Sequence, residues 1–180
     1  MKLFFKQNKD FLSVANQEFI EKRILNTDFP YFFQAAGAVS YSNQKDYFMS
    51  HMVLQRLEHS EDHRKAINTD LDIYHNTIDI LRNFCDSIGE KPYFFTRAGY
   101  NITFNCGFDK CEPHQDHDYD HKQIIIYLNN SLAKTIICSN GKPVKKITPE
   151  TGKGICFNNL PHYQEFPKSG IRLVLVATFI

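Results

Sequence analysis

Histidine and aspartate side chains crowd into one short segment of the chain, EPHQDHDYDH at residues 112–121, directly before the apolar run QIIIYL. Within it, His114 and Asp116 are two residues apart. An extended backbone sends alternate side chains to the same face, so this imidazole and this carboxylate would converge. Both groups bind divalent metals. The spacing therefore predicts part of a metal site.

A metal held in this way needs at least a third protein ligand. His162 follows the turn signal NNLP at 158–161 and precedes the last strands, so it can reach the same site from the opposite side. Two histidines and one aspartate match the facial triad that holds non-haem Fe(II) and leaves coordination positions open. His117 has the wrong strand parity and His121 lies beyond a polar stretch, so we expect neither to be a ligand, although both could line the entrance. The remaining histidines lie among polar neighbours and are interpreted as surface residues: His51, His59, His63 and His75.

The cysteines offer a competing metal site. Cys106, Cys111 and His114 could bind zinc, but their spacing is not that of a familiar zinc finger and it would use the histidine assigned to iron. The five cysteines form an odd set without a Cys-x-x-Cys pair, which suits reduced thiols in a cytoplasmic protein better than a disulfide framework.

An arginine interrupts the last apolar run, IRLVLVATFI, at position 172. An arginine in a strand that is apolar on both faces needs a partner, and its planar fork matches a carboxylate in two parallel hydrogen bonds. We therefore expect Arg172 to hold an acidic ligand that also reaches the metal. Arg97, in FFTRAGY, is interpreted as one half of a structural ion pair, with substrate or cosubstrate binding as the alternative.

The elements that must position these residues change character near Lys91–Pro92. Before this point, apolar residues recur at helical spacing in 11–24 and 71–89, which predicts two or three helices. After it come short runs rich in β-branched and aromatic residues, bounded by Gly, Asn, Asp and Pro, which predict strands. The fold class is α+β with a mainly β core, a sandwich or barrel of antiparallel strands with the helices packed on it. We expect one domain over 1–180, with a helical support region at 1–91 and the metal-bearing core at 92–180.

Composition limits the partners. The chain of 180 residues has 42% hydrophobic and 14% aromatic residues, enough for one sizeable core. Its formal net charge of +1 gives no broad field for a polyanion, so we do not expect nucleic acid as a partner. No signal peptide and no apolar run long enough to span a bilayer is present, so we expect neither secretion nor a membrane partner. The oligomeric state is left open.

From Tyr93 to Ile180 the sequence resembles the Fe(II)- and 2-oxoglutarate-dependent dioxygenases, particularly their prolyl-hydroxylase-like branch. The resemblance rests on PHQD, QIIIYLN, ITPETGKGICFNN and LPHYQEFPKSGIRLVLVATF, in the family's order and near its spacings. It implies a double-stranded β-helix, a jelly-roll or cupin-like barrel. It also implies an enzyme that uses Fe(II), 2-oxoglutarate and O2 to hydroxylate an amino acid, peptide or small metabolite, with release of succinate and CO2.

The resemblance also implies roles for individual residues. His114, Asp116 and His162 resemble the iron ligands, which are the catalytic centre of the family, and Arg172 resembles the residue that grips the distal carboxylate of 2-oxoglutarate. Tyr127 is similar to a tyrosine that hydrogen-bonds this cosubstrate. Relatives often carry a tyrosine where this chain has Phe104, and Asn105 is expected to substitute for it as a donor.

Further departures narrow the family branch. The Gly-Gly pair that relatives tend to have before the middle strand is replaced by LAKT at 132–135, which leaves the substrate side of the pocket undefined. Asp116 argues against halogenase relatives, and Thr178 stands where nucleic-acid demethylases usually have a second arginine. Two other functions stay open: a β-helix without catalytic activity that serves as a binding module, and an iron enzyme that uses the same triad without 2-oxoglutarate.

Overall fold

The computed structural model describes residues 2–34, 47–56 and 69–180. Two α-helices, one short π-helix and ten strands are present in this part of the chain. In chain order these are β1 (Phe5–Asn8), α1 (Val14–Phe19), the π-helix η1 (Ile20–Ile24), β2 (Phe32–Gln34), β3 (Phe48–Leu54), α2 (Leu71–Ser87), β4 (Phe95–Phe104), β5 (Lys122–Tyr127), β6 (Thr135–Ser139), β7 (Lys142–Ile147), β8 (Gly154–Asn158), β9 (His162–Gln164) and β10 (Ile171–Phe179).

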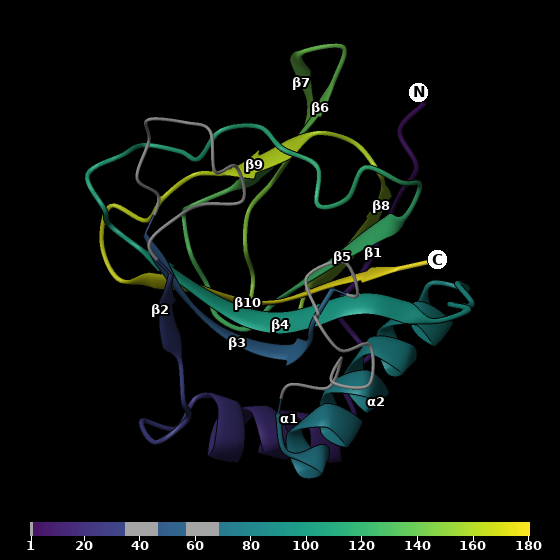
Figure 1. Ribbon diagram of the computed structural model, residues 1–180, viewed down its shortest axis with the longest axis vertical. Helices are drawn as coiled ribbons and strands as arrows, with labels where there is room; N and C mark the ends of the chain where they lie inside the picture. Colours follow the sequence, from purple (N-terminus) through teal and green to yellow (C-terminus); the bar gives the residue numbers. More distant parts are fainter. Residues whose placement is uncertain (1, 35–46, 57–68) are drawn as a thin grey trace.

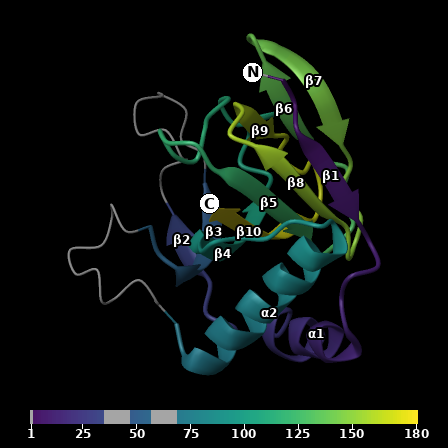
Figure 2. The same ribbon diagram turned by 90° about the vertical axis from the view of Figure 1, so that its right-hand side faces the viewer.

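The strands form two antiparallel sheets. The large sheet has seven strands in the order β1-β8-β5-β10-β4-β3-β2, and the small sheet has three in the order β7-β6-β9. Figures 1 and 2 show α1 and α2 below the large sheet, on the side away from β6 and β9. The expected mainly β fold with antiparallel sheets and packed helices is thus confirmed.

Side-chain parity in the large sheet separates two apolar layers. On β10, Leu173 and Leu175 belong to the core shared with the helices, whereas Val174 and Val176 belong to the core between the two sheets. The same alternation continues on β5, where Ile124 faces the helix side. Arg172 has the parity of Val174, and this parity aims its side chain at the space between the sheets.

Helix α2 anchors the outer face of the large sheet. Asp70 caps its first turn, because the carboxylate Oδ1 accepts a hydrogen bond from the Ile73 amide at 2.9 Å. The chain leaves the helix through Gly89, whose φ of 68° is a left-handed conformation that glycine adopts without strain. Phe84 of α2 is fully buried and packs so closely on Gly154 of β8 that a Cβ there would overlap the ring.

The N-terminal half differs from the prediction. Helices do form where the apolar spacing indicated, but β1, β2 and β3 also come from residues 1–91 and join the large sheet. The helical support region expected at 1–91 therefore also supplies three strands, which the sequence did not predict. The strand β3 was missed because its sequence, FMSHMVL, mixes polar and apolar residues on both faces: one face meets the pocket and the other meets the core. None of the helices in the described ranges is long and apolar enough to cross a membrane.

Candidate metal and anion site

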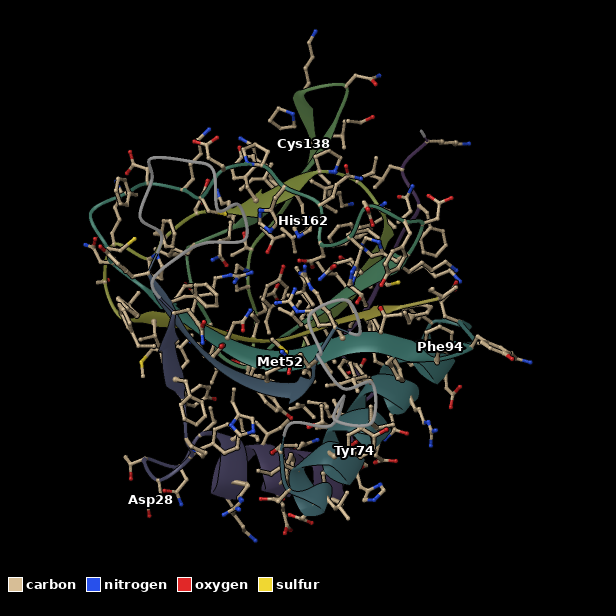
Figure 3. The ribbon with its side chains drawn as sticks, in the orientation of Figure 1. Asp28, Met52, Tyr74, Phe94, Cys138 and His162 are labelled. Carbon is tan, nitrogen blue, oxygen red and sulfur yellow. The ribbon has the colours of Figure 1, made fainter. Side chains whose placement is uncertain are left out.

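A pocket of about 360 Å3 lies between the two sheets. The large sheet contributes residues of β3, β4, β5 and β10, and the opposite wall comes from the segment around 111–116 and from β9. Figure 3 shows His162 on the small sheet's side and Met52 of β3 across from it, and both line the pocket. His114, Asp116 and Arg172 line it as well, so the fold brings the neighbouring His114 and Asp116 together with His162 and Arg172, which lie far away in the sequence.

The two histidines are held as a pair by the main chain. His114 and His162 form an isolated antiparallel bridge, with N–H···O distances of 3.0 and 2.9 Å, and their ring centres are 4.8 Å apart. Nδ1 of His114 lies 2.9 Å from the Glu112 carbonyl oxygen, and Nδ1 of His162 lies 3.2 Å from that of Leu160. A carbonyl oxygen only accepts, so Nδ1 carries the proton in both rings. This tautomer leaves the Nε2 lone pairs available to a metal.

The environment keeps His162 neutral. Burial and the nearby His114 lower the pKa of His162 to about 4, although Asp116 and the Leu160 carbonyl act in the opposite direction. A neutral imidazole is the form that binds a metal.

Asp116 is buried and ionised. Burial alone would raise the pKa of its carboxyl, but Arg97, both histidines and Arg56 together lower it well below the usual range. Its Oδ1 accepts hydrogen bonds from Arg97 Nη1 at 2.8 Å and from Arg56 Nη2 at 3.0 Å. The interpretation of Arg97 as an ion-pair residue is confirmed, and its partner is the aspartate assigned to the metal.

This pairing affects the metal site. Across the described ranges, no three histidine, cysteine or acidic side chains are grouped closely enough to hold a metal ion as they stand. The Asp116 carboxylate instead meets two guanidinium groups. The donor chemistry still fits Fe(II), because two imidazole rings and one ionised carboxylate line the same pocket.

Arg172 forms a separate cationic centre. Its side chain is fully buried, with the residue only 2% exposed. Nη1 donates to the Gln164 amide oxygen and Nη2 donates to Thr135 Oγ1 at 2.8 Å, while Nε has no hydrogen-bond partner. Burial lowers the pKa of Arg172, yet a guanidinium stays charged at any physiological pH. No carboxylate pairs with it among the described residues, so its charge is available to an anion.

Tyr127 lies next to this cation without lining the pocket. Its hydroxyl donates to Thr135 Oγ1 at 2.8 Å, and its ring centre is 5.6 Å from the Arg172 guanidinium carbon. Burial raises the pKa of the phenol, although Arg172 and Thr135 oppose the shift. As placed, Tyr127 orients the groups that face the pocket, whereas the sequence predicted that it touches the cosubstrate itself.

The assignment of Asn105 to the cosubstrate site is wrong. Asn105 is exposed after the end of β4, where its side chain bonds the Lys168 carbonyl and the Gly107 amide. Asn101 is the asparagine that lines the pocket, because it has the inward parity of β4. Asn105 was predicted from its distance to His114 along the chain, without regard to which side chains of β4 point into the pocket.

Other histidines also differ in part from expectation. His51, interpreted as a surface residue, is buried and bonds the Pro30 carbonyl and Thr69 Oγ1, both at 2.8 Å. His75 is exposed, as expected. His117 and His121 are buried beside each other, and neither is among the residues that line the pocket. His59 and His63 lie outside the described residues.

Thr135, Gln164 and Gln123 are polar residues of the pocket wall that the sequence analysis did not predict. Thr135 and Gln164 support Arg172, and Gln123 faces the pocket at the start of β5. Gln123 could have been found, because it is a polar residue at an inward position of a strand whose next four residues, IIIY, are buried.

Comparison with known proteins gives a fold and no sequence family. Neither a family model nor a curated protein sequence matches the chain. Among solved structures, a 2OG-Fe(II) oxygenase family oxidoreductase from Burkholderia pseudomallei is 18% identical, with a TM-score of 0.68 over 97% of this chain and 84% of that one. The chain has the fold of a 2-oxoglutarate- and Fe(II)-dependent oxygenase.

Two further structures of this kind support the assignment of the fold. A Pseudomonas putida prolyl-4-hydroxylase is 13% identical, with a TM-score of 0.60 over 97% of this chain and 91% of that one. The non-haem alpha-ketoglutarate-dependent carbocyclase SnoK from nogalamycin biosynthesis is 7% identical, with a TM-score of 0.64 over 97% and 79%. The resemblance expected from the sequence motifs is thus confirmed at the level of the fold.

Proposed function

We propose that this chain is an Fe(II)- and 2-oxoglutarate-dependent dioxygenase that hydroxylates an amino acid, a peptide or a small metabolite and releases succinate and CO2. In this proposal the two facing sheets are the double-stranded β-helix of these enzymes, and the protein acts in the cytoplasm. The proposal rests mainly on the presence of metal-binding groups and an anion-binding cation in the same pocket. Metal-binding groups lie in it together with a buried guanidinium that pairs with no carboxylate of the described residues.

His114, Asp116 and His162 would hold the iron. Bound there, Fe(II) supplies the activation of O2 that oxidation of an unactivated C–H bond requires. The protein prepares the ligands through their protonation states: the Glu112 and Leu160 carbonyls fix the histidine tautomers, and Arg97 keeps the aspartate ionised. His162 and Asp116 therefore have no proton to lose before a metal binds.

Arg172 would hold the distal carboxylate of 2-oxoglutarate. A buried cation without a counter-ion is unfavourable, and an incoming carboxylate relieves this cost. Thr135 and Gln164 already bind the two terminal nitrogens, so they fix the plane of the guanidinium before the anion arrives. Tyr127, through Thr135, stiffens the same arrangement. The free Nε lies in the same fork and is a further donor.

The proposal is tested by binding before any substrate is known. Anaerobic titration with Fe(II) should show one bound ion, and 2-oxoglutarate should then bind the iron-loaded protein in a calorimeter and give succinate in the presence of O2. Failure to bind Fe(II), or binding of Fe(II) without any binding of 2-oxoglutarate, would refute it.

One observation favours a second function, a metal-free binding module. The Asp116 carboxylate already has two guanidinium partners, and a structural ion pair of this kind needs no metal. A module of this type would bind anions at Arg172 with unchanged affinity in the presence of a chelator. An oxygenase would lose most of its affinity for 2-oxoglutarate under the same conditions, so one calorimetric comparison separates the two.

A further inference from the structure

Gln123 is a buried polar residue whose side chain has no hydrogen-bonding partner within the described part of the chain. The residue is only 1% exposed and lines the pocket from the first inward position of β5, and in residues 2–34, 47–56 and 69–180 nothing hydrogen-bonds its Oε1 or Nε2. A buried amide left unpaired costs on the order of 1–3 kcal/mol for each unsatisfied group. Since an apolar residue would avoid this cost, a structural role does not explain a glutamine at this position.

The polar neighbours of Gln123 in the sheet already form hydrogen bonds or ion pairs with other residues. Thr178, its cross-strand partner on β10, has its hydroxyl 2.8 Å from His117 Nε2 and 2.7 Å from Thr96 Oγ1. On the far side of Thr178, Arg97 occupies the same row on β4, and it donates to Asp116. Gln123 therefore lines the pocket in the same cross-strand row as Thr178 and Arg97, whose polar groups already have partners.

We propose that Gln123 binds a neutral primary carboxamide or a lactam of the substrate. Each of these groups has an acceptor and a donor side by side, which complements Oε1 and Nε2 of Gln123 in two antiparallel hydrogen bonds. A carboxylate would satisfy only Nε2 and would bring an extra charge into a buried wall. The inference rests on the proposed function only in treating the bound molecule as the one that is oxidised.

The surface next to Gln123 suits an aliphatic continuation of this ligand. Ile125 on β5 and Val176 on β10 follow in the next inward row, and Gly99 is their counterpart on β4. A Cβ at Gly99 would lie 3.1 Å from the His51 carbonyl oxygen and 3.3 Å from Met52 Sδ, so glycine allows β3 and β4 to pack closely there. A ligand that leaves the amide contact in this direction meets an apolar floor.

The experiment compares pentanamide with pentanoate, two probes with the same aliphatic chain and different head groups. Binding is measured from the shift of the thermal unfolding midpoint with probe concentration. The measurement is made in anaerobic protein with Fe(II) and 2-oxoglutarate, and again without either. The parent should bind pentanamide more tightly than pentanoate, and Gln123→Met should weaken pentanamide binding on the order of 10- to 100-fold. The control is Gln17→Met, which alters an exposed glutamine of α1 and should change nothing.

Three results would overturn the proposal. The parent could bind pentanoate more tightly than pentanamide, the parent and Gln123→Met could bind pentanamide equally well, or neither probe could bind. Weaker binding of 2-oxoglutarate by Gln123→Met would assign the residue to the cosubstrate instead.

If Gln123→Met does not fold, Gln123→Leu replaces it. Both variants are expected to unfold at or above the parent's midpoint because an unsatisfied amide is removed. Binding of pentanamide by protein that binds neither Fe(II) nor 2-oxoglutarate would refute the oxygenase and retain the amide site.

Discussion

Replacing Arg172 by methionine should separate ligand binding from folding, because binding should weaken strongly while stability should stay nearly unchanged. The guanidinium is buried, makes two hydrogen bonds to neutral groups and has no acidic partner among the described residues. Arg172→Met removes the charge and keeps an unbranched side chain. A carboxylate of 2-oxoglutarate would then be buried without its partner, which costs on the order of 2–5 kcal/mol. This corresponds to roughly 30-fold to several thousandfold weaker binding.

The fold should tolerate the same change. Removal of a buried cation that lacks a counter-ion relieves desolvation, and this gain offsets the two hydrogen bonds lost by Thr135 and Gln164. We expect the unfolding midpoint of Arg172→Met to stay near that of the parent. Arg172→Lys keeps the charge and loses the planar fork, so its affinity for 2-oxoglutarate should fall between those of arginine and methionine.

The assay is calorimetric titration of 2-oxoglutarate into anaerobic, iron-loaded protein, with circular dichroism to follow unfolding. Arg82→Met is the matched control, because it removes an exposed arginine of α2 far from the pocket. All variants should bind Fe(II) alike. If Arg172→Met binds 2-oxoglutarate as tightly as the parent, the role of a carboxylate clamp is wrong. The fold would then be the main remaining support for a 2-oxoglutarate enzyme.

Three other predictions concern the metal, the helix contact and acid stability. His114→Ala and His162→Ala should each abolish Fe(II) binding in an anaerobic titration without loss of the fold, and wild-type affinity in either would remove that residue from the ligand set. Gly154→Ala should destabilise the fold by about 1–3 kcal/mol in urea unfolding, because the new Cβ overlaps the buried Phe84 ring; an unchanged midpoint would contradict the packing. Burial raises the pKa of Glu90, but its two lysine partners lower it below the ordinary 4.5, so its stabilising effect is present above that pH and is lost as the pH falls below it. Glu90→Gln should therefore flatten the loss of stability below about pH 4.5, and a parallel pH profile would refute this assignment.

Local sequence patterns were sufficient for the elements with one dominant period. Helical spacing identified α1 and α2, and β-branched runs identified β4, β5, β6, β8 and β10. The strands β1, β2 and β9 are only three or four residues long, too short for a period to be read. They become strands because a neighbouring strand offers unpaired backbone groups, and this condition exists only in the folded sheet.

For the site, the sequence alone predicted four of the groups that line the pocket, through the His-x-Asp spacing of His114 and Asp116, the later His162 and Arg172 in an apolar strand. The tertiary structure decided how they are paired. In the structure the Asp116 carboxylate pairs with Arg97 and Arg56, and Arg172 has no counter-ion among the residues that the structure describes. Asn105 lies outside the pocket, and Gln123 lines it. The reason is physical. Residue type and strand parity are local properties that can be read from the sequence. Ion pairing and desolvation depend on which distant strands surround a group, and this is known only from the tertiary structure.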